Sequence, residues 1–346
     1  MAEIGAPALL MVLLIAGVEA ALRSQPVLHL IDEHRPPYGK ISMRLHVEKQ
    51  VWHLEAATRQ RSAPGRIVFL GSSSVANGID EPVAAAAFRD AGVTAEVKNF
   101  GLTGLAGNEL PSVAKYALAD RPAAVIFLYN GFSFGNDFNP DALDTRWDTA
   151  EMLRLTPPAP LDIHRGAEIV DRFFSQHFWL LKFRNLLVDT ARRWATGELR
   201  PLPHPFDYDP ARPVAENRPR TFAPAVSDTD WVRRAYLDSG RLSDSLGLKG
   251  LTRFCELARD AGVPLVLSAV PEPVFGRYEG YAQGVDYGAI DRRVEALAAR
   301  CGAVFLPRHA GMEERDEWFV DSVHMGTAGR NHFSAIIARE VAPYVR

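Results

Sequence analysis

The stretch that decides the fold lies at residues 67–78 and reads IVFLGSSSVANG. It opens with four apolar residues in a row and then reaches Gly71. A continuous apolar run of this length predicts a strand that is buried on both faces, as in a parallel sheet. Ligands of open parallel sheets bind outside the carboxyl ends of the strands, so the serines after Gly71 stand where a nucleophile is useful.

Four further apolar runs predict strands of the same kind, at residues 95–100, 123–129, 264–270 and 303–306. Helical patterns lie around and between these runs, at residues 81–91, 108–119, 247–261, 286–300 and 327–342. Strands that alternate with helices indicate βαβ units, right-handed crossovers and a parallel sheet. We therefore expect an α/β fold, a flavodoxin-like three-layer α/β/α sandwich with a five-stranded parallel sheet.

The N-terminus is apolar, because residues 4–18 contain no charged side chain. We interpret residues 1–23 as a hydrophobic membrane anchor or signal segment. The expected location is at a membrane, through a single-pass N-terminal anchor, with the rest of the protein outside the cytoplasm. The alternative is a buried N-terminal helix.

Two other regions stand apart from the strand–helix alternation. Residues 24–63 are mixed and polar and predict a linker that contains a helix. Within the α/β domain, expected at residues 64–346, a long insertion at about 138–245 carries an apolar, aromatic helix pattern at residues 169–194. A structureless connection of this length is uncommon, so we expect a cap-like helical insertion.

The composition narrows the class of protein. Hydrophobic residues make up 47% of the 346 residues, and the formal net charge is −3. This is typical of a globular protein and gives no reason to expect nucleic-acid binding. The two cysteines, Cys255 and Cys301, are too few for a disulfide framework, and no Cys/His cluster suggests zinc. No metal or organic cofactor is implied; the cysteines are either small buried side chains or one disulfide in an oxidising compartment.

A second motif that can carry chemistry lies at residues 318–327 and reads WFVDSVHMGT. Asp321 and His324 stand three positions apart. A serine hydroxyl is a weak nucleophile that needs a base, and an aspartate can hold a histidine in the orientation that serves as that base. An aspartate and a histidine at this spacing, without other evidence, more often lie on the surface with no catalytic role. The chain order Ser, Asp, His, on loops expected at one edge of the sheet, favours catalysis.

Two loops between these motifs can supply hydrogen-bond donors. Residues 99–104 read NFGLTG and follow the second predicted strand, and residues 129–137 read YNGFSFGND after the third. A glycine amide or an asparagine side chain in such loops can stabilise an oxyanion. The alternatives are an ordinary strand–helix turn and a polar turn without catalytic duty.

These four blocks, in this order, resemble the SGNH/GDSL hydrolase superfamily over residues 65–137 and 262–342. The resemblance implies that Ser73 is the nucleophile and that Asp321 and His324 complete a catalytic triad. The α/β-hydrolase fold shares the Ser, Asp, His order, but it requires Gly-x-Ser-x-Gly around the nucleophile and a longer spacing between Asp and His.

The resemblance also implies an oxyanion hole made of the Ser73 amide, the Gly104 amide and an asparagine side chain. The third block is stretched relative to the family pattern. Asn136 is our choice for the asparagine and Asn130 is the alternative, while Ser133 occupies the position that asparagine would take without the extra residues.

The function expected from this resemblance is serine-dependent hydrolysis of a carboxylic ester through an acyl-enzyme. The expected partners are an acyl-ester substrate, such as a lipid or an acylated cell-envelope glycan, and the membrane. One alternative is an O-acyltransferase that acts on a cell-envelope polysaccharide. Another is a catalytically inactive, membrane-tethered binding protein on the same fold.

Overall fold

The computed structural model describes residues 2–33, 43–59, 65–131, 133–134, 148–155, 170, 173–174, 176–198, 245–273, 286–313, 315–319 and 324–345. The chain divides into two compact units. Unit 1 comprises residues 1–61, 141–149 and 158–208. Unit 2 comprises residues 62–140, 150–157 and 209–346 and contains the sheet.

The sheet of unit 2 has five strands, which are β1 (Ile67–Gly71), β2 (Val97–Gly101), β3 (Ala124–Tyr129), β4 (Leu265–Ala269) and β5 (Val304–Phe305). The order in the sheet is β2-β1-β3-β4-β5, and every neighbouring pair is parallel. This is the flavodoxin-like strand order. The predicted fold class is therefore confirmed. All residues of β1, β3 and β4 are buried, as their apolar sequences require.

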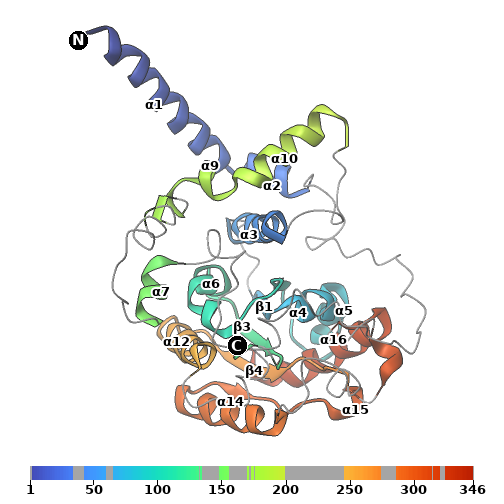
Figure 1. Cartoon of the computed structure of the whole chain (residues 1–346). Coiled ribbons are helices and arrows are strands. Elements are labelled where there is room, and N and C mark those ends of the chain that lie inside the picture. Colours follow the sequence, from blue (N-terminus) through green and yellow to red (C-terminus); the bar gives the residue numbers. More distant parts are fainter. Residues whose placement is uncertain are drawn as a thin grey trace. The chain divides into compact units, whose positions relative to one another are not determined.

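Helices cover both faces of this sheet (Figure 1). On one face α5 (Glu81–Asp90) and α16 (Thr327–Val341) pack against each other and share an apolar core with the strands. The crossovers between β2, β3, β4 and β5 place α6 (Leu110–Ala117), α12 (Leu246–Asp260) and α14 (Tyr287–Cys301) on the other face. The predicted helices of the α/β core agree with these bounds to within three residues.

The described residues of unit 2 also form several short elements. They are α4 (Ser73–Gly78), η1 (Gly107–Glu109), α7 (Thr149–Leu155), α15 (Ala310–Glu313), η4 (Asp316–Trp318) and η5 (Ala342–Tyr344). An aspartate or serine side chain caps the N-termini of α5, α12 and α14, whereas α16 begins after Gly326 without a side-chain cap. Such caps satisfy an amide that has no partner inside the helix.

In the described part of unit 1 the helices are α1 (Ala2–Leu22), α2 (Gln25–Glu33), α3 (Met43–Arg59), α9 (Trp179–Lys182) and α10 (Arg184–Ala195). The helices come from both the N-terminal segment and the insertion. Trp52 of α3 contacts the rings of Trp179 and Phe183 edge-on, at centroid distances of 5.5 and 4.8 Å. The aromatic pattern of the insertion thus forms two helices with Phe183 between them, and it packs on the segment that sequence analysis treated as a linker.

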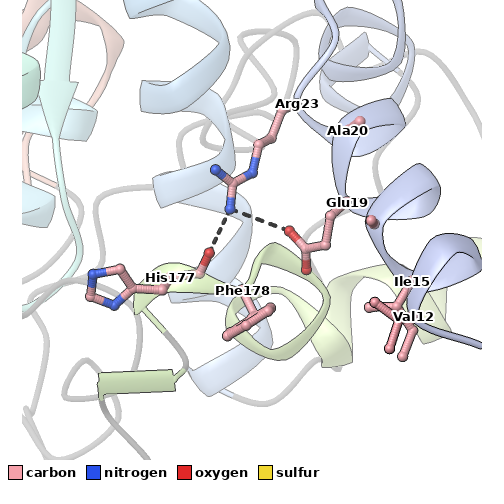
Figure 2. Close-up of a pocket in the computed structure, with 8 residues that line it drawn as sticks. Val12, Ile15, Glu19, Ala20, Arg23, His177 and Phe178 are labelled. Atoms are coloured by element: carbon pink, nitrogen blue, oxygen red, sulfur yellow. Dashed lines mark hydrogen bonds and ion pairs between the residues drawn. The ribbon is translucent and has the colours of Figure 1, made fainter. Parts of the chain in front are cut away.

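Glu19 fastens helix α1 to α9 within this unit. Its carboxylate accepts hydrogen bonds from the backbone amides of Trp179 (3.0 Å) and Leu180 (2.8 Å), at the N-terminus of α9. Arg23 donates to the same carboxylate and to the carbonyl of His177 (Figure 2). A cavity of about 600 Å3 lies beside this junction.

The apolar side chains of α1 are exposed from Leu9 to Ile15. No single helix among the described residues is long and apolar enough to cross a membrane. The segments Leu9–Leu22 and Gln25–Asp32 are long and apolar enough only when they are taken together, and the chain bends by 65° between them.

Candidate active site

Ser72, Ser73 and Ser74, which we call the serine turn, follow the carboxyl end of β1, where Gly71 ends the strand. Ser72 caps helix α4, and its side-chain oxygen accepts a hydrogen bond from the amide of Ser74 at 3.3 Å. Ser73 is the first residue of α4 and is partly exposed. The first amides of a helix have no partner inside it. The turn therefore presents the Ser73 hydroxyl next to a helix N-terminus.

Two glycines allow α4 to sit directly on the sheet. A Cβ atom on Gly101 would lie 2.1 Å from the backbone nitrogen of Ala76 in α4. A Cβ atom on Gly71 would lie 2.5 Å from the carbonyl oxygen of Leu128 in β3. Backbone atoms cannot move aside cheaply, so a larger residue at Gly101 would displace the helix that carries Ser73, and a larger residue at Gly71 would push against β3.

His324 comes to this turn from the opposite end of unit 2's sequence. Its Nε2 lies 2.9 Å from Oγ of Ser73, which is hydrogen-bond distance. An antiparallel bridge between Phe319 and Met325 closes the loop, and both side chains are buried in the core beneath α16. In the tautomer that carries its hydrogen on Nδ1, the imidazole accepts the hydrogen bond of the serine hydroxyl.

Asn99 in β2 ties the other end of α4 to the sheet. The side chain is fully buried, and its amide nitrogen lies 3.1, 3.2 and 3.0 Å from the carbonyl oxygens of Val75, Ala76 and Ile79. Its oxygen accepts a hydrogen bond from the amide of Gly101 at 2.9 Å. Asn99 thus satisfies carbonyl groups at the C-terminal end of α4 and fixes the helix on β2.

Asn130 follows β3 and holds the serine turn from the other side. Its buried amide nitrogen donates to the hydroxyl oxygens of Ser72 (2.9 Å) and Ser74 (3.3 Å). Its side-chain oxygen accepts a hydrogen bond from the Ser133 hydroxyl at 2.7 Å. These bonds use both hydrogens of the amide, so Asn130 positions the turn rather than pointing a donor at a substrate. Ser133, which occupies the position that asparagine would take without the extra residues, is hydrogen-bonded to Asn130.

Gly104 lies in a turn beside the serine turn. The turn is closed by a hydrogen bond from the Leu105 amide to the Leu102 carbonyl at 2.9 Å, and Gly104 has a positive φ of 66°. The Leu102 amide also donates to the carbonyl of Gly71 at 2.8 Å, which continues the pairing of β1 and β2. Gly104 therefore leaves the sheet at the same edge as Ser73.

The remaining two predicted site residues, Asp321 and Asn136, lie outside the described residues. The structure thus brings Ser73 and His324 into contact and puts Gly104 at the same edge of the sheet. Within the described ranges, no group of three His, Cys, Asp or Glu side chains is arranged to hold a metal ion.

A buried acidic side chain supports the loop that carries Asn130. Glu272 follows β4, is 2% exposed, and accepts a hydrogen bond from the Gly131 amide at 3.1 Å. The amide of Glu272 in turn lies 3.3 Å from the carboxylate of Glu313, which is also buried. The Glu272 carboxylate thereby connects the loops after β3 and β4, in addition to the backbone hydrogen bond from the Val270 amide to the Tyr129 carbonyl at 2.8 Å.

The positive charge of Arg308 lies next to these buried carboxylates and offsets part of their negative charge. Its guanidinium contacts Glu313 at 3.0 Å and Asp291 at 3.0 and 3.1 Å. Burial opposes its charge, but these hydrogen bonds and the nearby negative charges raise the pKa of Arg308 above its usual range. Burial, together with Asp291, also raises the pKa of Tyr129, whose hydroxyl donates to Asp291 at 2.8 Å. The arginine therefore stays charged and the tyrosine stays neutral.

Sequence reasoning missed the positioning roles of Asn99, Asn130 and Glu272. Asn99 and Asn130 lie in segments that were examined for oxyanion donors, and Glu272 lies in a Pro-Glu-Pro segment just after β4. A polar residue directly after a buried parallel strand is the signal that could have drawn attention to Glu272.

Comparisons with known proteins do not assign a function to this chain. No protein-family model and no curated protein matches the chain. Among solved structures, the chain is similar to the crystal structure of TesA, with 13% sequence identity and a TM-score of 0.41. That match covers 81% of this chain and 99% of TesA.

Proposed function

We propose that this chain is a serine hydrolase of the SGNH type that cleaves carboxylic esters. The observation that carries the proposal is the 2.9 Å approach of His324 Nε2 to Ser73 Oγ across most of unit 2's sequence. A nucleophile and a base within hydrogen-bond reach are the signature of an activated serine. Their position outside the carboxyl end of β1, next to β3 where the strand order reverses, is the usual ligand site of this fold.

In the proposed first step, Ser73 Oγ attacks the carbonyl carbon of the ester while its proton passes to Nε2 of His324. The tetrahedral intermediate then collapses, and the imidazolium gives this proton to the departing alcohol. An acyl group is left on Ser73 Oγ. In the second step His324 takes a proton from water, whose oxygen attacks the acyl carbon, and the carboxylic acid is released as Ser73 recovers its proton.

The proposed oxyanion hole consists of the backbone amides of Ser73 and Gly104 and the side chain of Asn136. Two observations support the amide pair. Ser73 is the first residue of a helix, and Gly104 lies in the adjacent turn with a positive φ. We assign Asn136, and not Asn130, to the third donor because both amide hydrogens of Asn130 are used by Ser72 and Ser74.

Asp321 is proposed to orient His324. A carboxylate that accepts the Nδ1 hydrogen keeps Nε2 free for the serine and stabilises the imidazolium that forms during catalysis. Phe319 and Met325, which flank Asp321 and His324 in the sequence, form an antiparallel bridge, and this pairing supports a short separation between the two side chains.

The test is steady-state hydrolysis of a p-nitrophenyl ester by the full chain. Ser73→Ala and His324→Ala should each reduce turnover to the background rate, since removing either member of such a unit costs about 10⁶-fold. His332→Ala is the matched control, because it removes an exposed histidine of α16 and should keep full activity. Hydrolysis by Ser73→Ala at the wild-type rate contradicts the proposal.

The same experiment separates hydrolysis from the acyltransferase alternative. Product analysis in the presence of a sugar acceptor should show free acid as the main product. Acylated sugar formed by the wild-type protein and absent with Ser73→Ala assigns the same site to transfer. A wild-type protein without any turnover and without covalent labelling favours the inactive binding protein.

We also propose that α1 holds the protein at a membrane. The support is the row of exposed apolar side chains from Leu9 to Ile15, which lies in the first of the two bent segments that together have the length and composition of a membrane span. Flotation of the full chain with phospholipid vesicles should carry the protein to the lipid fraction. Leu13→Arg should reduce the fraction of protein that floats, because a charged side chain in the apolar interior of the bilayer costs about 2.5–3.5 kcal/mol. Equal flotation of both proteins contradicts the anchor.

A further inference from the structure

Two cysteine side chains meet on the face of the sheet that α12 and α14 cover. Cys255 lies in α12 and is 2% exposed, whereas Cys301 is the last residue of α14 and is partly exposed. The two helices pack against each other in Figure 1. Both thiols are reduced in this structure.

The two cysteines line the same cavity, and their thiols differ in acidity. The hydrogen bond between them is the largest influence on both pKa values. It raises the pKa of Cys255 well above the usual range, an effect that burial reinforces, and it lowers the pKa of Cys301 to about 7. Partial burial opposes the Cys301 thiolate, whereas the Ala303 amide and the charge of Arg259 favour it. Cys301 is therefore the nucleophilic member, and Cys255 is a protonated neighbour behind it.

A cavity of about 340 Å3 opens onto both thiols. Its walls include Arg259, the residues that lead into β4 and β5, and Tyr344 near the C-terminus. This is the amino end of the strands, opposite the edge that carries Ser73. The cavity thus brings together a partly exposed thiol, a buried second thiol and a cationic side chain, and none of these groups is used by the proposed hydrolase site.

We propose that Cys255 and Cys301 form an oxidisable dithiol site that reacts with small, anionic disulfides such as glutathione disulfide in this cavity. The Cys301 thiolate attacks one sulfur of the disulfide, whose S–S bond breaks, and one glutathione thiolate leaves and takes a proton from water. Cys255 then loses its proton to solvent and attacks the Cys301 sulfur, which displaces the second glutathione. Two protein thiols are oxidised to one disulfide, and one glutathione disulfide is reduced to two thiols.

The difference between the two thiols dictates their order of reaction. Cys301 combines exposure with a lowered pKa, so it accepts the small molecule first. Cys255 is buried, so it resolves the mixed disulfide from within the protein. The carboxylates of glutathione suit the Arg259 guanidinium at the cavity wall. The finished cross-link joins α12 to the end of α14 and should raise the Tm, because it restricts the unfolded chain.

The test uses the reduced full chain, incubated with glutathione disulfide and analysed by intact mass and by thiol titration after denaturation. The expected result is a loss of both thiols, a mass lower by two hydrogens, no bound glutathione, and a proteolytic peptide pair linked through Cys255 and Cys301. Cys255→Ser should stop at the mixed disulfide and gain one glutathionyl group. Cys301→Ser should react about tenfold more slowly, because its remaining thiol is buried and protonated.

Three results would overturn the proposal. The wild-type protein could keep both thiols after oxidation, or it could stop at a stable mixed disulfide. Alternatively, Cys301→Ser could react as fast as Cys255→Ser. A Tm measurement on each variant shows that it is folded, and unchanged ester hydrolysis by the variants keeps this outcome separate from the fate of the Ser73 proposal.

Discussion

The replacement Asn99→Ala tests how the fold holds the proposed nucleophile in place. Asn99 is the buried residue that connects β2 to the C-terminal end of α4, the helix that begins with Ser73. Removing its amide leaves the carbonyl oxygens at that end of the helix, and the amide of Gly101, without this partner. The helix then loses its side-chain connection to β2.

The expected cost follows from the number of bonds. The Asn99 amide has two hydrogens shared among three carbonyl groups, and its oxygen accepts one bond, which amounts to three hydrogen bonds. At about 1 kcal/mol net for each, the loss is about 3 kcal/mol. For a domain of this size, 1 kcal/mol lowers the Tm by about 2–4 °C, so the expected decrease is about 6–12 °C.

The assay is thermal unfolding of the full chain, followed by far-UV circular dichroism, with ester hydrolysis measured on the same samples. Asn77→Ala is the matched control. Asn77 lies in the same helix, but its amide makes one hydrogen bond, to the Ser73 carbonyl at 3.0 Å, and the side chain is partly exposed. Its replacement should lower the Tm by no more than about 4 °C, from the loss of about 1 kcal/mol.

The hydrolysis rate separates a positioning role from a purely structural one. If Asn99 positions α4, then Asn99→Ala should lower kcat at a temperature where the protein is still folded, while KM changes little. A Tm equal to that of Asn77→Ala, or a normal kcat in the folded variant, refutes the reasoning.

Four further replacements test other parts of the account. Gly101→Ala should destabilise unit 2 and lower kcat, since its Cβ would lie 2.1 Å from a backbone nitrogen of α4; thermal unfolding that matches the wild type contradicts this packing. Asn136→Ala should lower kcat about 10²-fold at unchanged Tm, whereas Asn130→Ala should lower both; the reverse pattern exchanges their roles. Burial lowers the pKa of His309, so the unfolded chain binds more protons as the pH falls through its ordinary value of about 6.5, and stability is lost there. His309→Gln should therefore show a smaller fall in Tm than the wild type between about pH 7.5 and pH 5.5, and parallel curves argue against a buried neutral imidazole.

The sheet of unit 2 was predictable because a parallel strand buried on both faces must be apolar over its whole length. The strands β1, β3 and β4 can be recognised in the sequence as such apolar runs. The helical patterns between the runs indicate that the strands are parallel. Unit 1 was not predictable by the same means. Glu19 interrupts an apolar run, and nothing near it in sequence shows that its carboxylate caps a helix 160 positions later.

The proposed site divides along similar lines. Ser73 and His324 follow sequence motifs with a chemical meaning, and the strand order brings them to one edge of the sheet. The residues that hold the site in place have no motif. Whether Asn130 reaches Ser72 or a substrate depends on the register of β1 against β3 and on the path of the next loop, which composition and spacing do not determine.

The central claim is that His324 activates Ser73, and covalent labelling tests it most directly. A fluorophosphonate should add one phosphonyl group to the full chain, and peptide mapping should locate it on Ser73. The reaction should become slow in His324→Ala, since the hydroxyl then lacks a base, while His332→Ala should react like the wild type. Labelling on another residue, or labelling at an undiminished rate in His324→Ala, contradicts the account.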